Sequence, residues 1–158
     1  MDEIIKLNRR HIEQLAIIDF ESEHQNSSKY INRKEMKKSV QNRFDKGHEI
    51  FFGYKQNNEL VGYVTLKPFF PGYKHCEVYW LAVKKKFQGQ GLGTKLMKFI
   101  EKYAKKNGFR KVYLYTGKNM KLTRKFYKKI GYKLINEFPE YYGYPSGNTT
   151  AVLYAKSL

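Results

Sequence analysis

The chain has 158 residues, of which 41% are hydrophobic, and it contains 14 tyrosines and 11 phenylalanines. This length and composition argue against global disorder and predict one domain, residues 1–158, with a substantial core. Basic residues outnumber acidic ones by 31 to 14, a formal net charge of +17.

Several classes of site are excluded by composition. The single cysteine, Cys76, rules out an internal disulfide and a cysteine-built metal site. The four histidines show no paired ligand spacing, so we expect no metal.

The N-terminal stretch carries charges where a signal peptide is apolar, and the longest apolar run, Val78 to Val83, is too short to span a bilayer. We therefore expect a soluble, cytoplasmic protein.

The positive charge is concentrated in one segment. Residues 84–133 hold fifteen lysines and two arginines against a single acid, Glu101, a net charge of +16. The remaining sequence is close to neutral. A basic segment of this kind predicts an anionic ligand or partner.

In the first half, two helices are expected between a short strand and a hairpin. Ile4 to Leu7 favours a strand, and apolar residues three or four apart from Ile12 to Asp19 favour a helix. A polar loop and a second helix, Arg33 to Lys46, follow, with Gly47 as its end. Two β-rich runs, 50–54 and 60–66, flank a turn and predict a hairpin.

The second half alternates strands and helices. The expected elements are a strand 75–83, a helix from Leu92 closed by Asn107 and Gly108, a strand 112–116, a helix 122–130 ended by Gly131, and closing strands 132–138 and 149–155. The order is βααβββαβαββ, typical of an α+β fold.

Three glycines stand between the long strand and the helix that follows it. Gly89, Gly91 and Gly93 lie in the stretch FQGQGLGTKLMKF. A glycine-rich turn before a helix is a phosphate-binding arrangement, because first-turn amides lack intrahelical partners and glycine lets an anion approach. The spacing fits neither GxxxxGK[ST] nor GxGxxG. The open alternative is a turn needed only for close helix packing.

The segment resembles the Q/R-x-x-G-x-G/A element of the GCN5-related N-acetyltransferase (GNAT) superfamily, with Gln88, Gly91 and Gly93 at the key positions. TRKFYKKIGY, residues 123–132, is similar to the second signature of that family, a helix ending in FYxxxGF. The resemblance extends to the order of elements and the tyrosine-rich tail. It implies the GNAT fold: a central mixed, mostly antiparallel seven-stranded sheet with four helices, splayed between strands 4 and 5.

The resemblance also implies a cofactor, acetyl-coenzyme A. The diphosphate would bind the backbone of the turn and first helical residues, and the pantetheine arm would pair with the main chain of the preceding strand. The implied cofactor-binding residues are Gln88, Gly89, Gln90, Gly91, Leu92, Gly93 and Thr94 in the turn, and Leu81, Ala82 and Val83 in the strand. An amide at Ala82 or its neighbour would hold the acetyl oxygen, where the family has a strand bulge.

Two side chains match the family's proton-transfer positions. Glu77 resembles the general base of the histone-acetylating branch, although a carboxylate that only pairs with His75 or a lysine is an equal alternative. A base used by other members falls on Leu114 and is missing. Tyr127 falls on the tyrosine that protonates the thiolate; its ordinary pKa of about 10 is near that of an alkyl thiol. The alternative is a core tyrosine beside Phe126.

Three more residues enter as candidates. Asn119 stands one residue before the family's asparagine position, so it is expected either to contact the pantetheine or, preferably, to cap the next helix. Tyr141 and Tyr142 are candidate substrate-binding residues, in a loop that would face the one at 21–30.

The predicted function is acetyl transfer from acetyl-coenzyme A to a primary amine of a small molecule or peptide, in a ternary complex. The first alternative is an acetyltransferase for peptide N-terminal α-amino groups. The second, from another class, is a non-catalytic basic module that binds RNA or the ribosome. We expect a monomer or homodimer with no membrane partner, and ordinary lysine richness as the simplest origin of the basic segment.

Overall fold

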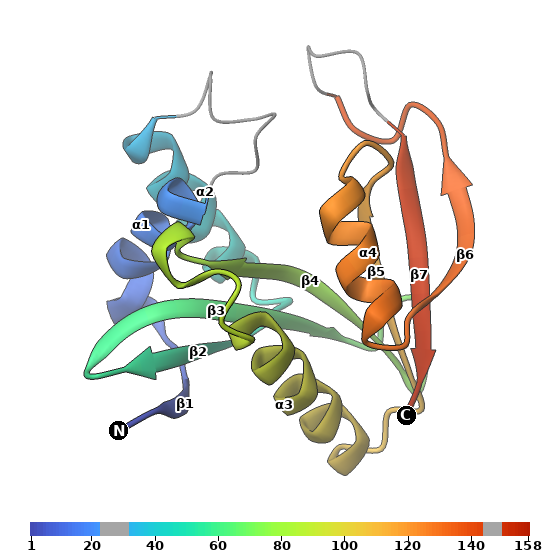
Figure 1. Ribbon diagram of the computed structural model, residues 1–158, viewed down its shortest axis with the longest axis horizontal. Coiled ribbons are helices and arrows are strands. Elements are labelled where there is room, and N and C mark those ends of the chain that lie inside the picture. Colours follow the sequence, from blue (N-terminus) through green and yellow to red (C-terminus); the bar gives the residue numbers. More distant parts are fainter. Residues whose placement is uncertain (23–31, 144–149) are drawn as a thin grey trace.

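The computed structural model describes residues 1–22, 32–143 and 150–158. In these residues, one seven-stranded sheet is flanked by four α-helices (Figure 1). The strands are β1 Glu3–Lys6, β2 Ile50–Gln56, β3 Glu59–Pro68, β4 His75–Val83, β5 Lys111–Gly117, β6 Lys133–Phe138 and β7 Ala151–Ser157. The helices are α1 Ile12–Ser22, α2 Arg33–Lys46, α3 Leu92–Lys106 and α4 Lys121–Lys129, with short 3-10 helices η1 Arg9–His11 and η2 Lys85–Phe87.

The expected order of elements is confirmed, with boundaries within three residues of those predicted; the largest difference is the end of α1, at Ser22 instead of Asp19. Helix α2 shows why its limits were readable from sequence. At its start, the side chains of Asn32 and Glu35 bond each other's backbone amides at 3.0 Å, a capping box. At its end, Gly47 adopts a left-handed conformation with φ of +66°.

The sheet has the order β1-β2-β3-β4-β5-β7-β6, and every neighbouring pair is antiparallel except β4 and β5. These two strands pair in parallel over three residues each, ending at Glu77 and Tyr113. Beyond that point they diverge, and Figure 1 shows the gap between the β4 side and the β5–β7–β6 side of the sheet. The predicted mixed sheet, split between strands 4 and 5, is confirmed.

Two hydrophobic clusters cover the two faces of the sheet. The larger lies beneath α3 and α4, and includes Leu96 and Ile100 of α3 and Tyr127 of α4. The smaller lies beneath α1 and α2 and includes Leu15 and Val40. Since side chains alternate along a strand, the two faces of β4 therefore belong to different halves of the molecule.

Candidate active site

The predicted glycine turn leads into α3 with an open backbone. Gly89 and Gly91 have φ of +75° and +79°, a left-handed conformation that favours glycine. A Cβ built at either position would meet no atom within 4 Å beyond its chain neighbours. The space beside both glycines is therefore free for a ligand to approach the main chain.

The N-terminus of α3 has the features of an anion site. Gly91 is the N-cap, and no side chain caps the helix. The first turn contains no acidic residue, so nothing in it competes for the positive end of the helix dipole. The amides of Leu92, Gly93 and Thr94 are first-turn donors without intrahelical acceptors, the arrangement that binds phosphate groups.

Two residues of the predicted cofactor set, Gly93 and Gln88, have roles in the fold itself. A Cβ at Gly93 would lie 3.4 Å from Phe126 Cζ, so this glycine allows α3 and α4 to approach each other. The side chain of Gln88 donates 2.8 and 3.4 Å hydrogen bonds to the carbonyls of Val83 and Ser22. Helix packing, the alternative reading of the glycines, thus applies to Gly93, while Gly89 and Gly91 leave open space.

Strand β4 has one free side where the predicted pantetheine contacts lie. Leu81, Ala82 and Val83 pair with β3 on one side, but β4 no longer pairs with β5 there. The bulge expected near Ala82 lies instead at Tyr79, because Val78 and Trp80 pair with consecutive residues of β3. A bulge changes the direction of the strand, so the amide groups after Tyr79 do not point along the regular hydrogen-bond pattern of the sheet.

Glu77 lies at the last paired position of β4, where the split begins. It is half-buried, and burial raises its pKa, an effect that the neighbouring Lys67 ammonium only partly offsets. Lys67 is its partner across β3, and the Lys67 Nζ lies 3.2 Å from the ring centroid of Tyr79. A carboxyl whose pKa is raised toward neutrality is suited to accept a proton from an ammonium group.

Aromatic rings surround the open side of Glu77. Tyr115 stacks on Tyr141 with centroids 5.2 Å apart and an interplanar angle of 12°, and Tyr142 meets Tyr141 edge-on at 5.1 Å. Burial raises the pKa of both Tyr115 and Tyr141; the charge of Glu77 adds to the shift of Tyr115, and Tyr115 and then Glu77 add to that of Tyr141. Tyr141, one of the two predicted substrate residues, thus lies within the electrostatic reach of the predicted base. Most of the loop expected to face these tyrosines, residues 23–30, is outside the described residues.

Tyr127 points from α4 into the larger core. It is 7% exposed and contacts the rings of Phe126, Tyr132 and Tyr154 at 5.2 to 6.5 Å between centroids. Burial raises the pKa of its phenol well above the ordinary value, so the group stays protonated at neutral pH. The described residues give its hydroxyl no hydrogen-bond partner. The phenol is therefore a largely buried group that keeps its proton.

Asn119 does not cap α4. The N-cap of that helix is Met120, and no side chain makes a capping hydrogen bond. Asn119 is exposed, and its Oδ1 would lie 2.8 Å from a Cβ built at Gly117. The expected cap is therefore wrong, because the helix begins two residues after Asn119.

Behind β4, a buried polar network fixes the strand at its bulge. The carboxylate of Asp19, 6% exposed, accepts hydrogen bonds from the Tyr63 hydroxyl at 2.8 Å and the Trp80 indole at 2.9 Å. Arg43 bonds the same Tyr63 hydroxyl and pairs with the buried Glu49. Sequence reasoning missed this network, since its five members come from four separate elements and a loop.

Lys67, Tyr79 and Tyr115 were also missed. Alternation along each strand places them on the Glu77 side of the sheet, but only the register shows it. The hairpin pattern alone indicates the strands and not which residues pair. If the pairing of β3 with β4 had been known, counting every second residue from Glu77 would have identified the side chains on its face.

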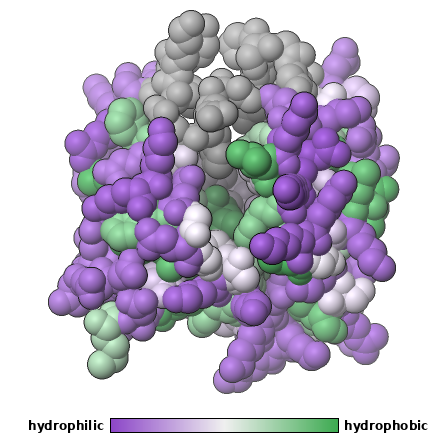
Figure 2. Space-filling view, in the orientation of Figure 1, coloured by the Kyte–Doolittle hydropathy of each residue, from purple (hydrophilic) through white to green (hydrophobic). Residues whose placement is uncertain are grey.

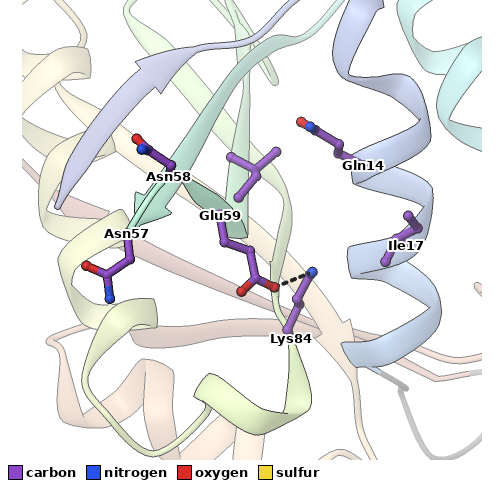
Figure 3. Close-up of a pocket in the computed structure, with 7 residues that line it drawn as sticks. Gln14, Ile17, Asn57, Asn58, Glu59 and Lys84 are labelled. Carbon is purple, nitrogen blue, oxygen red and sulfur yellow. Dashed lines mark hydrogen bonds and ion pairs between the residues drawn. The ribbon is translucent and has the colours of Figure 1, made fainter. Parts of the chain in front are cut away.

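Two shallow pockets lie away from the glycine turn. One, about 410 Å³, lies between α1 and the β2–β3 turn, where Lys84 bonds Glu59 at 2.9 Å; Figure 3 shows Gln14 and Ile17 approaching from the helix. The other, about 360 Å³, is lined by Tyr79, Trp80 and residues of α2. Only this second pocket reaches the β4 bulge, on the side of Glu77.

In the part of the chain that the structure describes, no three His, Cys, Asp or Glu side chains come together to hold a metal ion. Among the same residues, none of the helices combines the length and the hydrophobicity that crossing a membrane requires.

The chain matches the family model described as Acetyltransferase (GNAT) family over residues 10–132. Among curated proteins it is 33% identical over 86 residues to a Xenopus tropicalis protein described as Probable N-acetyltransferase 14. That alignment spans 54% of this chain and 41% of the relative, less than half of its length.

Solved structures of acetyltransferases share the fold. The ribosomal-protein-S18-alanine N-acetyltransferase of Escherichia coli has a TM-score of 0.76 and 18% identity, over 99% of this chain and 94% of that one. A GNAT family acetyltransferase from Elizabethkingia anophelis, with acetyl-CoA bound, has a TM-score of 0.75 and 21% identity, over 99% and 98% of the two chains. At these identities the likeness concerns the fold.

Proposed function

Because this chain belongs to the GNAT family of acetyltransferases, we propose that it acetylates a primary amine with acetyl-coenzyme A, by direct transfer in a ternary complex. One observation carries the proposal: the uncapped N-terminus of α3 comes one short connection, residues 84–91, after the end of β4 that has left β5. An anion site beside an unpaired strand suits a cofactor with a diphosphate and an amide-containing arm. A fold neighbour with acetyl-CoA bound supports the choice.

The described residues fit this cofactor. The diphosphate would lie against the amides from Gln88 to Thr94, where Gly89 and Gly91 leave space. The pantetheine arm would pair with the main chain of β4 from Leu81 to Val83, and the exposed Asn119 would contact it. When bound, acetyl-coenzyme A would supply the acetyl group as an activated thioester.

Two side chains would move protons. Glu77 would take a proton from the acceptor ammonium at a carboxylate oxygen, directly or through water, which leaves the amine able to react. Tyr127 would give the proton of its Oη to the leaving sulfur. Burial raises the pKa of both groups. For Glu77 the shift favours accepting a proton, as a base must. For Tyr127 it keeps the phenol protonated until the proton is donated.

The acceptor would bind on the Glu77 side of the sheet. The faces of Tyr79, Tyr141 and Tyr142 are suited to an ammonium group, which is attracted to aromatic faces. Lys67 already places an ammonium on Tyr79, which shows that the ring accepts such a contact. An acceptor with one amine on a small or extended body fits this surface.

The second candidate acceptor is the α-amino group of a peptide. A fold neighbour is named for the alanine of a ribosomal protein, which supports including such peptides among the candidates. Family membership favours an enzyme over a non-catalytic module.

The test is an assay of free coenzyme A over a panel of amines that includes ribosomal-protein N-terminal peptides, spermidine, aminoglycosides and lysine. Release of free coenzyme A with one class of amine would identify that class as the acceptor. No release above the rate without an amine, in a protein that binds the cofactor by calorimetry, would reject the proposed activity.

A further inference from the structure

The outer side of α3 carries a stripe of lysines that no acid neutralises. Lys98, Lys102, Lys105 and Lys106 are exposed on the side opposite the buried residues of the helix. Among the described residues none of the four forms an ion pair. The one acid of the helix, Glu101, is engaged with Lys156 at 2.8 Å. Figure 2 shows hydrophilic side chains over the region of α3.

This stripe is unfavourable for the isolated helix. Like charges three or four residues apart on a helix repel each other, and Lys98, Lys102 and Lys106 follow at spacings of four. The proposed diphosphate site does not account for them. It lies at the first turn of α3, and the stripe runs to the last turn, roughly 20 Å away at 1.5 Å per residue.

An exposed aromatic loop adjoins the end of the same stripe. Phe69, Phe70 and Tyr73, in the β3–β4 loop, are 61%, 44% and 79% exposed. The loop contacts the segment after α3, because Phe69 meets Phe109 at 5.3 Å between centroids and the Arg110 amide donates a 2.8 Å hydrogen bond to the Lys74 carbonyl. Three aromatic side chains gathered in one exposed loop indicate an interaction surface.

We propose that the lysine stripe of α3 and the aromatic loop 69–74 together bind single-stranded nucleic acid. Lysines spaced along a helix match a phosphate backbone, and exposed rings at one end offer faces on which unpaired bases stack. A duplex would use the lysines but hides its bases, so the rings favour a single strand. The lysine stripe lies on the α3 side of the sheet, opposite the side of Glu77; of the loop rings, Phe70 lies on the Glu77 side, 5.7 Å from the Nζ of Lys67, so Phe69 and Tyr73 are the rings that would complete the surface.

The test measures fluorescence anisotropy of a labelled 12-nucleotide oligouridylate and of its oligodeoxythymidylate counterpart. We expect a dissociation constant on the order of 1 to 100 μM near 100 mM salt, weakening as salt rises. Lys102→Glu with Lys106→Glu should weaken binding at least tenfold and lower the salt slope by about 1.4, since each phosphate contact contributes about 0.7. The matched control, Lys34→Glu with Lys38→Glu on α2, should change it less than twofold.

The ring contribution is tested separately. Tyr73→Ala and Phe69→Ala should each weaken binding about fivefold or more without changing the salt slope, because stacking involves no charge. Equal binding of RNA and DNA would indicate that the 2′-hydroxyl is not read; a stronger RNA signal would assign RNA as the ligand. Saturating acetyl-coenzyme A should leave both affinities unchanged.

Four results would overturn the proposal. They are equal affinity for a duplex of the same length, no effect of the two ring substitutions, full competition by acetyl-coenzyme A, and preferential binding to vesicles with 30% anionic lipid. Circular dichroism of each variant checks that a loss of binding is not a loss of fold.

Discussion

The indole Nε1 of Trp80 donates a 2.9 Å hydrogen bond to the buried carboxylate of Asp19. Trp80 directly follows the bulge residue of β4, so this bond joins α1 to the strand at its bulge. Burial raises the pKa of Asp19 from 3.8 to about 6, although hydrogen bonds from Tyr63 and Trp80 and the charge of Arg43 act in the opposite direction.

This shift predicts a pH dependence of stability. Between about pH 4 and pH 6 the folded protein keeps the Asp19 proton while the unfolded chain releases it, so the contribution to the unfolding free energy is fully present below pH 3.8 and is lost as pH rises through 6. A shift of about two pKa units corresponds to about 3 kcal/mol. Urea unfolding of wild type and Asp19→Asn from pH 4 to 7 measures the difference.

The comparison isolates one group, since Arg43 and Glu49, which also face Asp19, are present in both proteins. Wild type should lose stability relative to Asp19→Asn as pH rises. Asp45→Asn, at an exposed acid outside this network, is the control variant. A flat curve for Asp19→Asn would contradict the assignment.

A second prediction concerns the glycine turn. Gly91→Leu should abolish measurable coenzyme A binding in calorimetry, because the side chain would occupy the space beside the first-turn amides of α3 and strain a residue with φ of +79°. Gly108→Leu is the matched control, since Gly108 has a similar φ of +84° and open space after the far end of α3. Both variants should lose about 1 to 2 kcal/mol of stability. Equal affinities in the two would remove the turn from the cofactor site.

A third prediction separates two neighbouring phenols. Tyr127→Phe should lower kcat by about 10²-fold or more with little change in KM for the cofactor, because only proton donation is lost. Tyr132→Phe, in ring contact at 5.9 Å, should leave kcat unchanged. Its buried hydroxyl lies near the carboxylate of Glu101 without a hydrogen bond of normal length, so its removal should cost at most about 1 kcal/mol of stability. Similar kcat values for Tyr127→Phe and wild type would exclude it as the acid.

The fourth prediction concerns Glu77. If it is the base, kcat/KM should rise with pH along a limb whose midpoint lies above the ordinary glutamate pKa, because burial raises its pKa. Glu77→Gln should remove this limb and lower kcat by about 10²- to 10⁴-fold. The exposed Glu3 provides the control variant, Glu3→Gln, which should keep the wild-type profile. A limb that persists in Glu77→Gln would assign it to another group.

The fold was largely readable from the sequence because its signals are local. Periodicity changes, the Asn32 cap and the Gly47 stop each depend on a few neighbouring residues. The β2–β3 turn was placed to within a residue, with Asn57 and Asn58 adopting the positive φ that asparagine tolerates. The split of the sheet came from the family resemblance, since no local pattern marks where β4 leaves β5.

The site was less readable, because it depends on register and on side-chain direction. The sequence indicated Glu77 and Tyr141 separately. They lie near each other because Tyr141 stacks on Tyr115, and Tyr115 belongs to β5, which pairs with β4 for three residues only. The bulge at Tyr79 and the wrong cap at Asn119 each reflect a shift of a few residues that helix and strand propensities do not determine. The Lys67 contact with Tyr79 arises from a bulge that sequence patterns do not show.

Past Glu77 and Tyr113, the two strands β4 and β5 cease to pair with each other and each turns a row of amide and carbonyl groups toward the gap. An interior sheet edge of this kind invites strand addition from another chain, as exposed outer edges do. A pantetheine arm in the gap would act as a removable strand, so we expect the cofactor to slow amide exchange in both strands and to suppress self-association of the purified protein. The ligand would then serve as part of the sheet as well as the source of the acetyl group.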